Sequence, residues 1–217
     1  MKDWTFNNKK IVEKFDDHVR EQLPFYELIS ESIFFIVKNY LTENNIVIDI
    51  GSSTGNMIER LSDTLLQRNC KIIAIDKSEE MCKFLVNKYK SPYFNVINGD
   101  ITEIEIPDAQ VYILNLTIMF IPVDKREKFI NNIFKKLKKG GCIIIVDKIC
   151  DYNGYLATVM KRLTWFWKLN NNACPKEILN KEMSLVGVQI PILDTDIING
   201  KEFFRLGEFA GWVIEKE

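Results

Sequence analysis

The sequence predicts an α/β protein with a Rossmann-like fold: a mostly parallel, seven-stranded sheet with helices on both faces and an N-terminal helical layer. Short, wholly apolar runs alternate with stretches of helical periodicity, which is typical of strands buried on both faces of a doubly wound sheet. A glycine-containing turn follows the first run, as in folds that bind nucleotides at this position. The five runs are Ile46–Ile50, Lys71–Asp76, Phe94–Asn98, Gln110–Leu116 and Cys142–Asp147.

Helical periodicity fills the gaps between these runs. We expect Gly140-Gly141 to end the last helix and to turn the chain into the next strand. The expected helices are Gly55–Gln67, Glu79–Lys90 and Asp124–Lys138.

Two further helices are expected before the first strand, over Lys9–Gln22 and Tyr26–Thr42, and Pro24 separates them. The C-terminal third predicts helices over Asn153–Leu169 and Pro175–Leu185. We expect two closing strands, over Gly187–Leu193 and Arg205–Ile214.

The chain length favours a single domain over residues 1–217, because 217 residues with 47% hydrophobic side chains can bury one sizeable core. Within it we expect residues 1–43 to form a helical cap and residues 150–186 to form a helical insertion over the site.

Composition argues against several classes of partner. Lys and Arg number 29 and Asp and Glu number 30, so the net charge offers no attraction to nucleic acid, although a local basic patch stays open. No apolar run reaches the roughly 20 residues that span a bilayer, and there is no apolar leader at the N-terminus. The five cysteines show no C-x-x-C pairing. We therefore expect a cytoplasmic protein without membrane contact, and no metal site.

The stretch VIDIGSSTG contains the first candidate site. Gly51 and Gly55 lie in the turn after the first strand, where the backbone can approach a ligand closely. The spacing G-x-x-x-G, with Ser52 and Ser53 inside it, differs from the G-x-G-x-x-G of dinucleotide sites and suits a smaller nucleoside ligand better. The alternative is a tight turn that serves packing only.

Polar residues also end the next three strands. Asp76 can accept hydrogen bonds from both hydroxyls of a ribose, although it can instead help to cap the following helix, a task that Ser78 can perform unaided. Asp100, in the stretch NGDI, can meet an adenine amino group. Asn115 can reach a ligand or satisfy local backbone groups.

With these residues in place, the sequence resembles the class I S-adenosylmethionine-dependent methyltransferases. It is most similar to the carboxy-S-adenosylmethionine synthase family. The resemblance runs from Asp3-Trp4-Thr5-Phe6 through Leu23-Pro24-Phe25-Tyr26, VIDIGSSTG, NCKIIAIDKS, NGDI and LNLT to about Glu182. That is most of the chain.

The resemblance implies S-adenosylmethionine as the cofactor and a role for nine residues around it. It also implies a homodimer and, for true synthases, prephenate as donor of a carboxyl group. Tyr26 would close over the cofactor; Gly51, Ser52 and Ser53 would contact its methionine part; Asp76 and Lys77 would bind the ribose, Asp100 and Ile101 the adenine, and Asn115 would lie near the reactive end.

Glu182 departs from the family pattern. The synthases carry an arginine at this position that binds the extra carboxylate of the carboxylated cofactor, whereas a glutamate places a negative charge there. Two carboxylates in a closed site repel each other unless one is protonated. The alternative is that Glu182 is a solvated helix residue. The chain after Gln189 is also shorter than in the synthases, so the acceptor pocket is expected to differ.

The leading hypothesis is a methyltransferase that uses ordinary S-adenosylmethionine on a small-molecule acceptor. Such a transfer needs an aligned acceptor and exclusion of water, not a protein nucleophile, so no catalytic residue is assigned. The alternatives are a carboxy-S-adenosylmethionine synthase and a cofactor-binding module without catalysis. In the synthase, carboxy-S-adenosylmethionine would be bound through another cation, with Lys161, Arg162, Lys168 and Lys181 as the candidates. His18 is expected to be a surface or packing residue.

Overall fold

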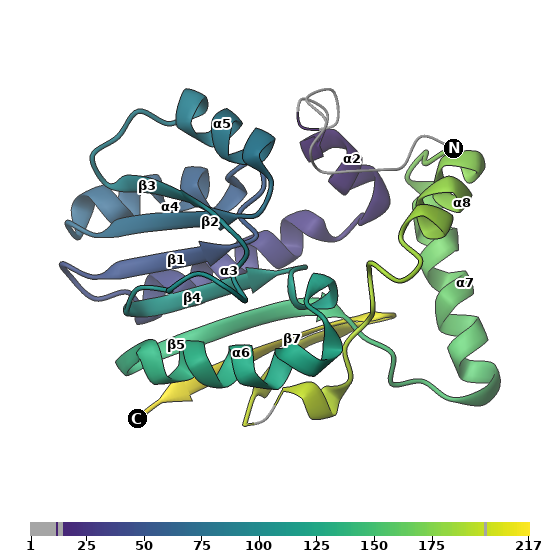
Figure 1. The fold of residues 1–217 in the computed structure, drawn as a ribbon. Helices are drawn as coiled ribbons and strands as arrows, with labels where there is room; N and C mark the ends of the chain where they lie inside the picture. Colours follow the sequence, from purple (N-terminus) through teal and green to yellow (C-terminus); the bar gives the residue numbers. More distant parts are fainter. Residues whose placement is uncertain (1–11, 13–14, 198) are drawn as a thin grey trace.

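The computed structural model describes residues 12, 15–197 and 199–217. One seven-stranded sheet, in the order β3-β2-β1-β4-β5-β7-β6, forms its centre (Figure 1). β1 to β5 are parallel, and β7 runs antiparallel to both of its neighbours. The strands are β1 (Ile46–Ile50), β2 (Lys71–Asp76), β3 (Phe94–Asn98), β4 (Ala109–Asn115), β5 (Leu137–Lys148), β6 (Lys201–Leu206) and β7 (Phe209–Lys216).

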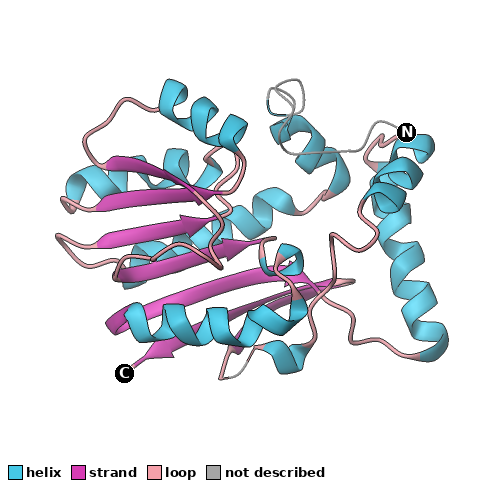
Figure 2. Cartoon of the chain, viewed as in Figure 1, coloured by secondary structure: helices cyan, strands magenta, loops and turns pink. Residues whose placement is uncertain are grey.

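Helices cover both faces of this sheet, as the cartoon in Figure 2 shows. The fold class predicted from the sequence is therefore confirmed. The α-helices are α2 (Phe15–Gln22), α3 (Tyr26–Tyr40), α4 (Asn56–Gln67), α5 (Glu79–Lys88), α6 (Val123–Lys136), α7 (Gly154–Asn170) and α8 (Pro175–Ser184), and two 3₁₀ turns are η1 (Ile118–Phe120) and η2 (Asp194–Asp196).

Alternation of side chains along the strands divides the core into two clusters, one on each face of the sheet. Val47, Val111 and Ile113 pack under α3 and α4 in the first cluster. Ile48 and Leu114 pack under α6 in the second. Because both faces are buried, the central strands are apolar at nearly every position, which is the pattern that predicted a parallel sheet.

The C-terminal strands were predicted only in part. Gly187–Leu193 is not a strand: its single sheet-like contact is an isolated bridge between Ile192 and Ile149. The predicted strand Arg205–Ile214 is instead a hairpin, in which β6 and β7 are joined at Gly207, a residue with φ +57°. The polar, half-exposed residues at the start of β6 give no strong strand signal, so the sequence pattern missed its first residues.

The expected break at Gly140-Gly141 is also wrong. The helix α6 already ends at Lys136, and the glycines lie inside the long strand β5. An added Cβ at Gly141 would lie 2.3 Å from the carbonyl oxygen of Gln110, so this glycine allows two backbones to approach closely.

Beyond the carboxyl ends of the parallel strands stand α7 and α8, with α2 beside them (Figure 1). Of the expected N-terminal helix Lys9–Gln22, the structure describes Phe15–Gln22 as helix, and Asp3–Phe6 lie outside the described residues. None of the helices in the described part of the chain is long and apolar enough to cross a membrane.

Candidate functional site

The turn between β1 and α4 has an unusual backbone. Gly51, Ser53 and Gly55 all have positive φ values, of 74°, 50° and 85°. A side chain at Gly55 would lie 2.7 Å from the ring of Tyr89, in addition to the cost of this left-handed conformation. The glycines of VIDIGSSTG are therefore required by the tight turn itself.

This turn is bonded to the end of β2. The backbone amides of Gly51 and Ser52 donate to the Ile75 carbonyl oxygen over 2.8 and 3.2 Å, and the Ser53 amide donates to Asp76 Oδ2 over 2.9 Å. The turn and the predicted ribose anchor thus form one hydrogen-bonded unit.

Asp76 does not act as the side-chain cap of α5. Ser78 Oγ accepts the capping hydrogen bond from the Met81 amide over 3.2 Å, while Asp76 Oδ1 accepts from the Ser78 amide over 2.8 Å. Burial raises the pKa of Asp76, and these backbone amides oppose that shift. Each carboxylate oxygen has a second lone pair, so Asp76 retains acceptor capacity for two hydroxyl groups.

Lys77, which follows β2, and Asp100, which lies beyond the end of β3, form an ion pair with 2.8 Å between Nζ and Oδ2. Asp100 Oδ1 accepts from both the amide and the hydroxyl of Thr102. The Lys77 hydrogen bond is the main reason that the pKa of Asp100 falls to about 2. Ile101, which follows Asp100, is half-buried against the core cluster under α6.

Asn115 ends β4 next to this unit, because β4 pairs with β1 so that Leu114 lies opposite Ile50. Thr117 Oγ1 donates to the Ile50 carbonyl oxygen over 2.9 Å and so joins the two strand ends. Two buried polar atoms, Ser52 Oγ and Asn115 Oδ1, have no hydrogen-bond partner within the described residues. Buried polar atoms normally have partners, so these two atoms suit contact with a polar ligand.

Four polar side chains share one face of the sheet at its carboxyl edge. Each lies two residues after a member of the core cluster under α3 and α4, and residues two apart in a strand project to the same face. Their strands β2, β1, β4 and β5 are consecutive neighbours. These side chains are Asp76, Asp49, Asn115 and Lys148.

Asp49 was missed in the sequence analysis, although a carboxylate inside an otherwise apolar strand is a visible signal. It is 4% exposed, and burial together with the charge of Asp76 raises its pKa to about 7. Tyr26, at the start of α3, is also buried, and its pKa rises to about 12 through burial and then the nearby charge of Asp49. The structure thus places Tyr26 near the end of β1, the strand that leads into the turn.

The helix α2 of the N-terminal layer contacts both the glycine turn and the C-terminal helix α8. In α2, Asp16 accepts a hydrogen bond from the Thr54 hydroxyl in the glycine turn. His18 Nε2 lies 3.1 Å from Lys181 Nζ of α8. Burial and the charge of Lys181 lower the pKa of His18 to about 4, so its ring is neutral at pH 7. The helix α2 therefore links the turn to the C-terminal helices.

Glu182 is not a solvated residue. Its carboxylate lies 2.7 Å from Lys161 Nζ and 3.5 Å from Lys168 Nζ, both on α7. Burial raises its pKa, but the Lys161 hydrogen bond and the charges of Lys148, Lys161 and Lys168 outweigh that effect and hold it at about 2. The negative charge of Glu182 is therefore offset by Lys161 and Lys168, two of the cations that were expected to replace the arginine.

The three consecutive aromatic residues of α7, Trp165, Phe166 and Trp167, differ in how far they are packed against the rest of the protein. Trp167 meets Phe25 edge-on, with ring centroids 5.4 Å apart, whereas Trp165 and Phe166 are 41% and 56% exposed. Packing explains Trp167 alone.

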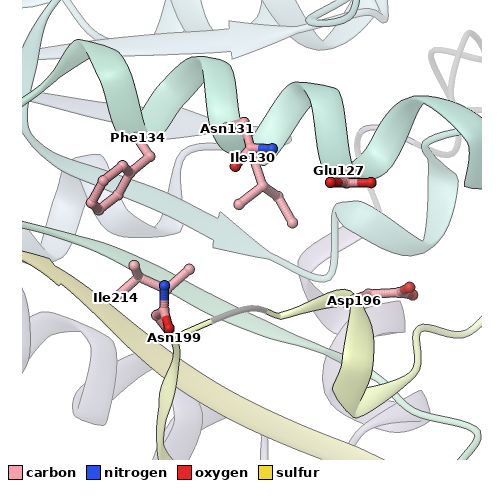
Figure 3. A pocket seen from close by; sticks show the side chains of 7 residues that line it. All are labelled: Glu127, Ile130, Asn131, Phe134, Asp196, Asn199 and Ile214. Carbon is pink, nitrogen blue, oxygen red and sulfur yellow. The ribbon is translucent and has the colours of Figure 1, made fainter.

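A small surface cavity of about 140 Å³ lies elsewhere, between α6 and the C-terminal strands (Figure 3). Glu127 and Asn131 of α6 face Asp196 and Asn199 across an apolar floor that includes Phe134. None of the predicted site residues lines this cavity.

The part of the chain that contains the glycine turn is similar to a known family of domains. Residues 47–141, which contain the turn and the carboxyl ends of β1 to β4, match the model of a methyltransferase domain. A curated carboxy-S-adenosyl-L-methionine synthase of Staphylococcus epidermidis is 33% identical over 87% of this chain and 82% of its own length. The chain belongs to the carboxy-S-adenosyl-L-methionine synthase family. A synthase of Shewanella sp. strain ANA-3 is 30% identical over 98% of this chain and 88% of its own length.

Solved structures support the fold of this family. A crystal structure of an S-adenosyl-L-methionine-dependent methyltransferase candidate from Methanococcus maripaludis superimposes with a TM-score of 0.61 at 20% identity, covering 100% of this chain and 96% of the other. Human N-acetylserotonin methyltransferase also gives 0.61, at 13% identity, over 97% of this chain and 57% of the other. The predicted class I methyltransferase class, its enzymatic nature and its cofactor are thus confirmed at the level of the family.

Proposed function

We propose that the chain binds ordinary S-adenosylmethionine at the glycine turn and transfers its methyl group to a small-molecule acceptor. The observation that carries this proposal is the bonded unit of turn and strand end, in which the Ser53 amide fixes the Asp76 carboxylate. The bound sulfonium supplies the methyl group. The role of the chain is to bind, align and exclude water.

Each predicted residue has a place in this proposal. Gly51, Ser52 and Ser53 lie against the amino-acid part of the cofactor, where the unpaired Ser52 Oγ finds a partner. The Asp76 carboxylate accepts the ribose hydroxyls, and Lys77 holds Asp100 at the adenine side, where Ile101 also lies. Asn115, with its unpaired Oδ1, lies nearest the reacting end. Tyr26 and the 150–186 helices cover the site.

Glu182 bears on the choice of cofactor. No arginine occupies its position, which favours the ordinary cofactor over the carboxylated one. The acceptor is not expected to be an amine held by Glu182, because Lys161 and Lys168 already neutralise its carboxylate.

Carboxy-S-adenosylmethionine synthesis is the second candidate. The curated relatives bear that name, and the negative charge of Glu182 is not free to repel an added carboxylate, because two lysines contact it. The lysines would then perform the task of the missing arginine.

Mass spectrometry of the small molecule released from purified, denatured protein separates the two candidates. The protein is first incubated with S-adenosylmethionine, with and without prephenate. The proposal predicts unmodified S-adenosylmethionine in both samples. Carboxylated cofactor in the prephenate sample would reject it in favour of the synthase activity. The variant to compare with the wild type is Glu182→Gln, which removes only the charge. Glu182→Arg is less suitable, because it would place a further cation beside Lys161 and Lys168.

A cytoplasmic homodimer belongs to the same proposal. It is supported by the free cysteines and by large apolar side chains that the surface of α7, α8 and the following loop exposes. Light scattering after size exclusion is expected to give twice the 25.4 kDa chain mass, and a monomer at micromolar concentration would contradict it. The exposed side chains include Tyr155, Leu156, Phe166, Leu169, Leu179, Met183, Val186 and Val188.

A further inference from the structure

Four lysines gather around Glu182 from three different elements. Lys148 ends β5, Lys161 and Lys168 lie on α7, and Lys181 lies on α8. Each of Lys148, Lys168 and Lys181 has a pKa lowered first by burial and then by the charge of another lysine of this group. Their ammonium groups are therefore close enough to repel one another.

Among the described residues, two carboxylates act on three of these lysines, Lys148, Lys161 and Lys168. Glu182 contacts Lys161 and Lys168, and Glu208 acts on Lys148, Lys161 and Lys168 through its charge. Lys148 is 7% exposed and lies within hydrogen-bonding reach of Lys161, but it forms no ion pair with any residue that the structure describes. A buried cation without a contacting anion is costly, so an anionic ligand group at this position would lower that cost.

The lysines also lie beside the reacting end of the proposed site. Val146 pairs with Asn115 across β4 and β5, and Lys148 projects from the same face two residues further along β5. The helices α7 and α8 lie beyond the carboxyl ends of these strands (Figure 1).

We infer that Lys148, Lys161 and Lys168, supported by Lys181, form an anion subsite for a carboxylate or phosphate group of the methyl acceptor. This inference rests on the proposed function, since it names the class of acceptor for the same site. Within it, Glu182 offsets part of the lysine charge through its contacts with Lys161 and Lys168, and the cluster stays positive.

The test uses isothermal titration with two probes, inorganic phosphate and malonate, added to the full chain saturated with S-adenosylhomocysteine. We expect saturable binding of at least one probe, and the stronger probe identifies the acceptor group as phosphate or carboxylate. Lys148→Met and Lys168→Met are expected to weaken probe binding at least about tenfold, the scale of one charge-assisted hydrogen bond. Lys139→Met, an exposed lysine on β5, is the matched control and should not change it.

Glu182→Gln gives a result of the opposite sign. Removing the negative charge leaves the lysines with a larger excess of positive charge, so anion binding should strengthen about threefold or more. A loss of anion binding in this variant would contradict the charge-offsetting role of Glu182, and retention of full affinity in both lysine variants would overturn the subsite.

S-Adenosylhomocysteine affinity, measured in the same variants, separates the two proposals. If every variant binds it as the wild type does, each is folded, and the absence of probe binding in the wild type would overturn the anion subsite alone. If the wild type fails to bind S-adenosylhomocysteine, the proposed function fails. Titration of the two probes into the cofactor-free protein then tests the subsite by itself. Weaker probe binding in the lysine variants would support the subsite, and unchanged probe binding would reject it.

Discussion

The backbone amide of Ser53 donates to Asp76 Oδ2 over 2.9 Å, and this bond joins two segments 23 residues apart in the chain. Ser53 can present its amide in this direction because its own φ is positive, between two glycines that are also left-handed. The turn and the carboxylate are therefore positioned as a unit before any ligand arrives, which reduces the ordering that binding requires.

Gly55→Ala tests the turn. The new Cβ would meet Leu85 and Tyr89 at 2.8 Å or less and would also carry the left-handed penalty of roughly 1–2 kcal/mol. We expect a fall in the free energy of unfolding of about 2 kcal/mol or more, measured by urea denaturation. Gly187→Ala is the control, because its φ is +73° but nothing lies within 4 Å of the new Cβ. Equal losses in both variants would show that the contacts around Gly55 do not matter.

The pH dependence of stability tests the state of Glu182. Its folded pKa of about 2 lies below the ordinary value of 4.5. Its ionisation therefore stabilises the fold fully above pH 4.5, and that contribution disappears as the pH falls toward 2. Wild type should exceed Glu182→Gln in unfolding free energy at pH 7, with the difference shrinking between pH 4.5 and 3. The same change at the exposed Glu177 serves as control, and a difference that stays constant with pH would be evidence against the ion pairs.

Arg126 holds the segment before η2 in place. It is 2% exposed, and its guanidinium donates to the carbonyl oxygens of Ile121, Ile190 and Pro191 and pairs with Asp196. Replacing it leaves these buried acceptors without partners.

Arg126→Met should therefore lower the free energy of unfolding by about 3 kcal/mol or more, as breaking a buried ionic network does. Denaturant unfolding measures the loss. Exposed Arg162→Met provides the comparison, and a loss as small as that of Arg162→Met would refute the bracing role of Arg126.

The strand ends were predictable because they depend on local pattern. Apolar runs interrupted by Asp76 or Asn115 mark the carboxyl edge of a parallel sheet, and the first five strands and most helices follow from this signal. The hairpin of β6 and β7 was not predictable in the same way. Its edge strand β6 is half polar, and its short turn contains only one glycine, Gly207, as a turn signal.

The surroundings of Glu182 depend on long-range contacts that sequence patterns do not contain. Lys148 lies on β5 and Lys161 on α7, and only the tertiary fold brings their charges near Glu182 on α8. A sequence shows the charge of each residue but not which opposite charge will meet it. For the same reason, a solvated helix position remained an alternative for Glu182 when only the sequence was considered.

Isothermal titration of S-adenosylmethionine into wild type, Asp76→Asn and Asp63→Asn tests the central claim most directly. Asp63 is an exposed aspartate of α4, outside the site. The account predicts saturable binding to wild type and Asp63→Asn, and a loss of roughly 10- to 100-fold in Asp76→Asn, the value of one or two hydrogen bonds to a charged group. Equal affinities in wild type and Asp76→Asn, or no binding to wild type, would contradict it.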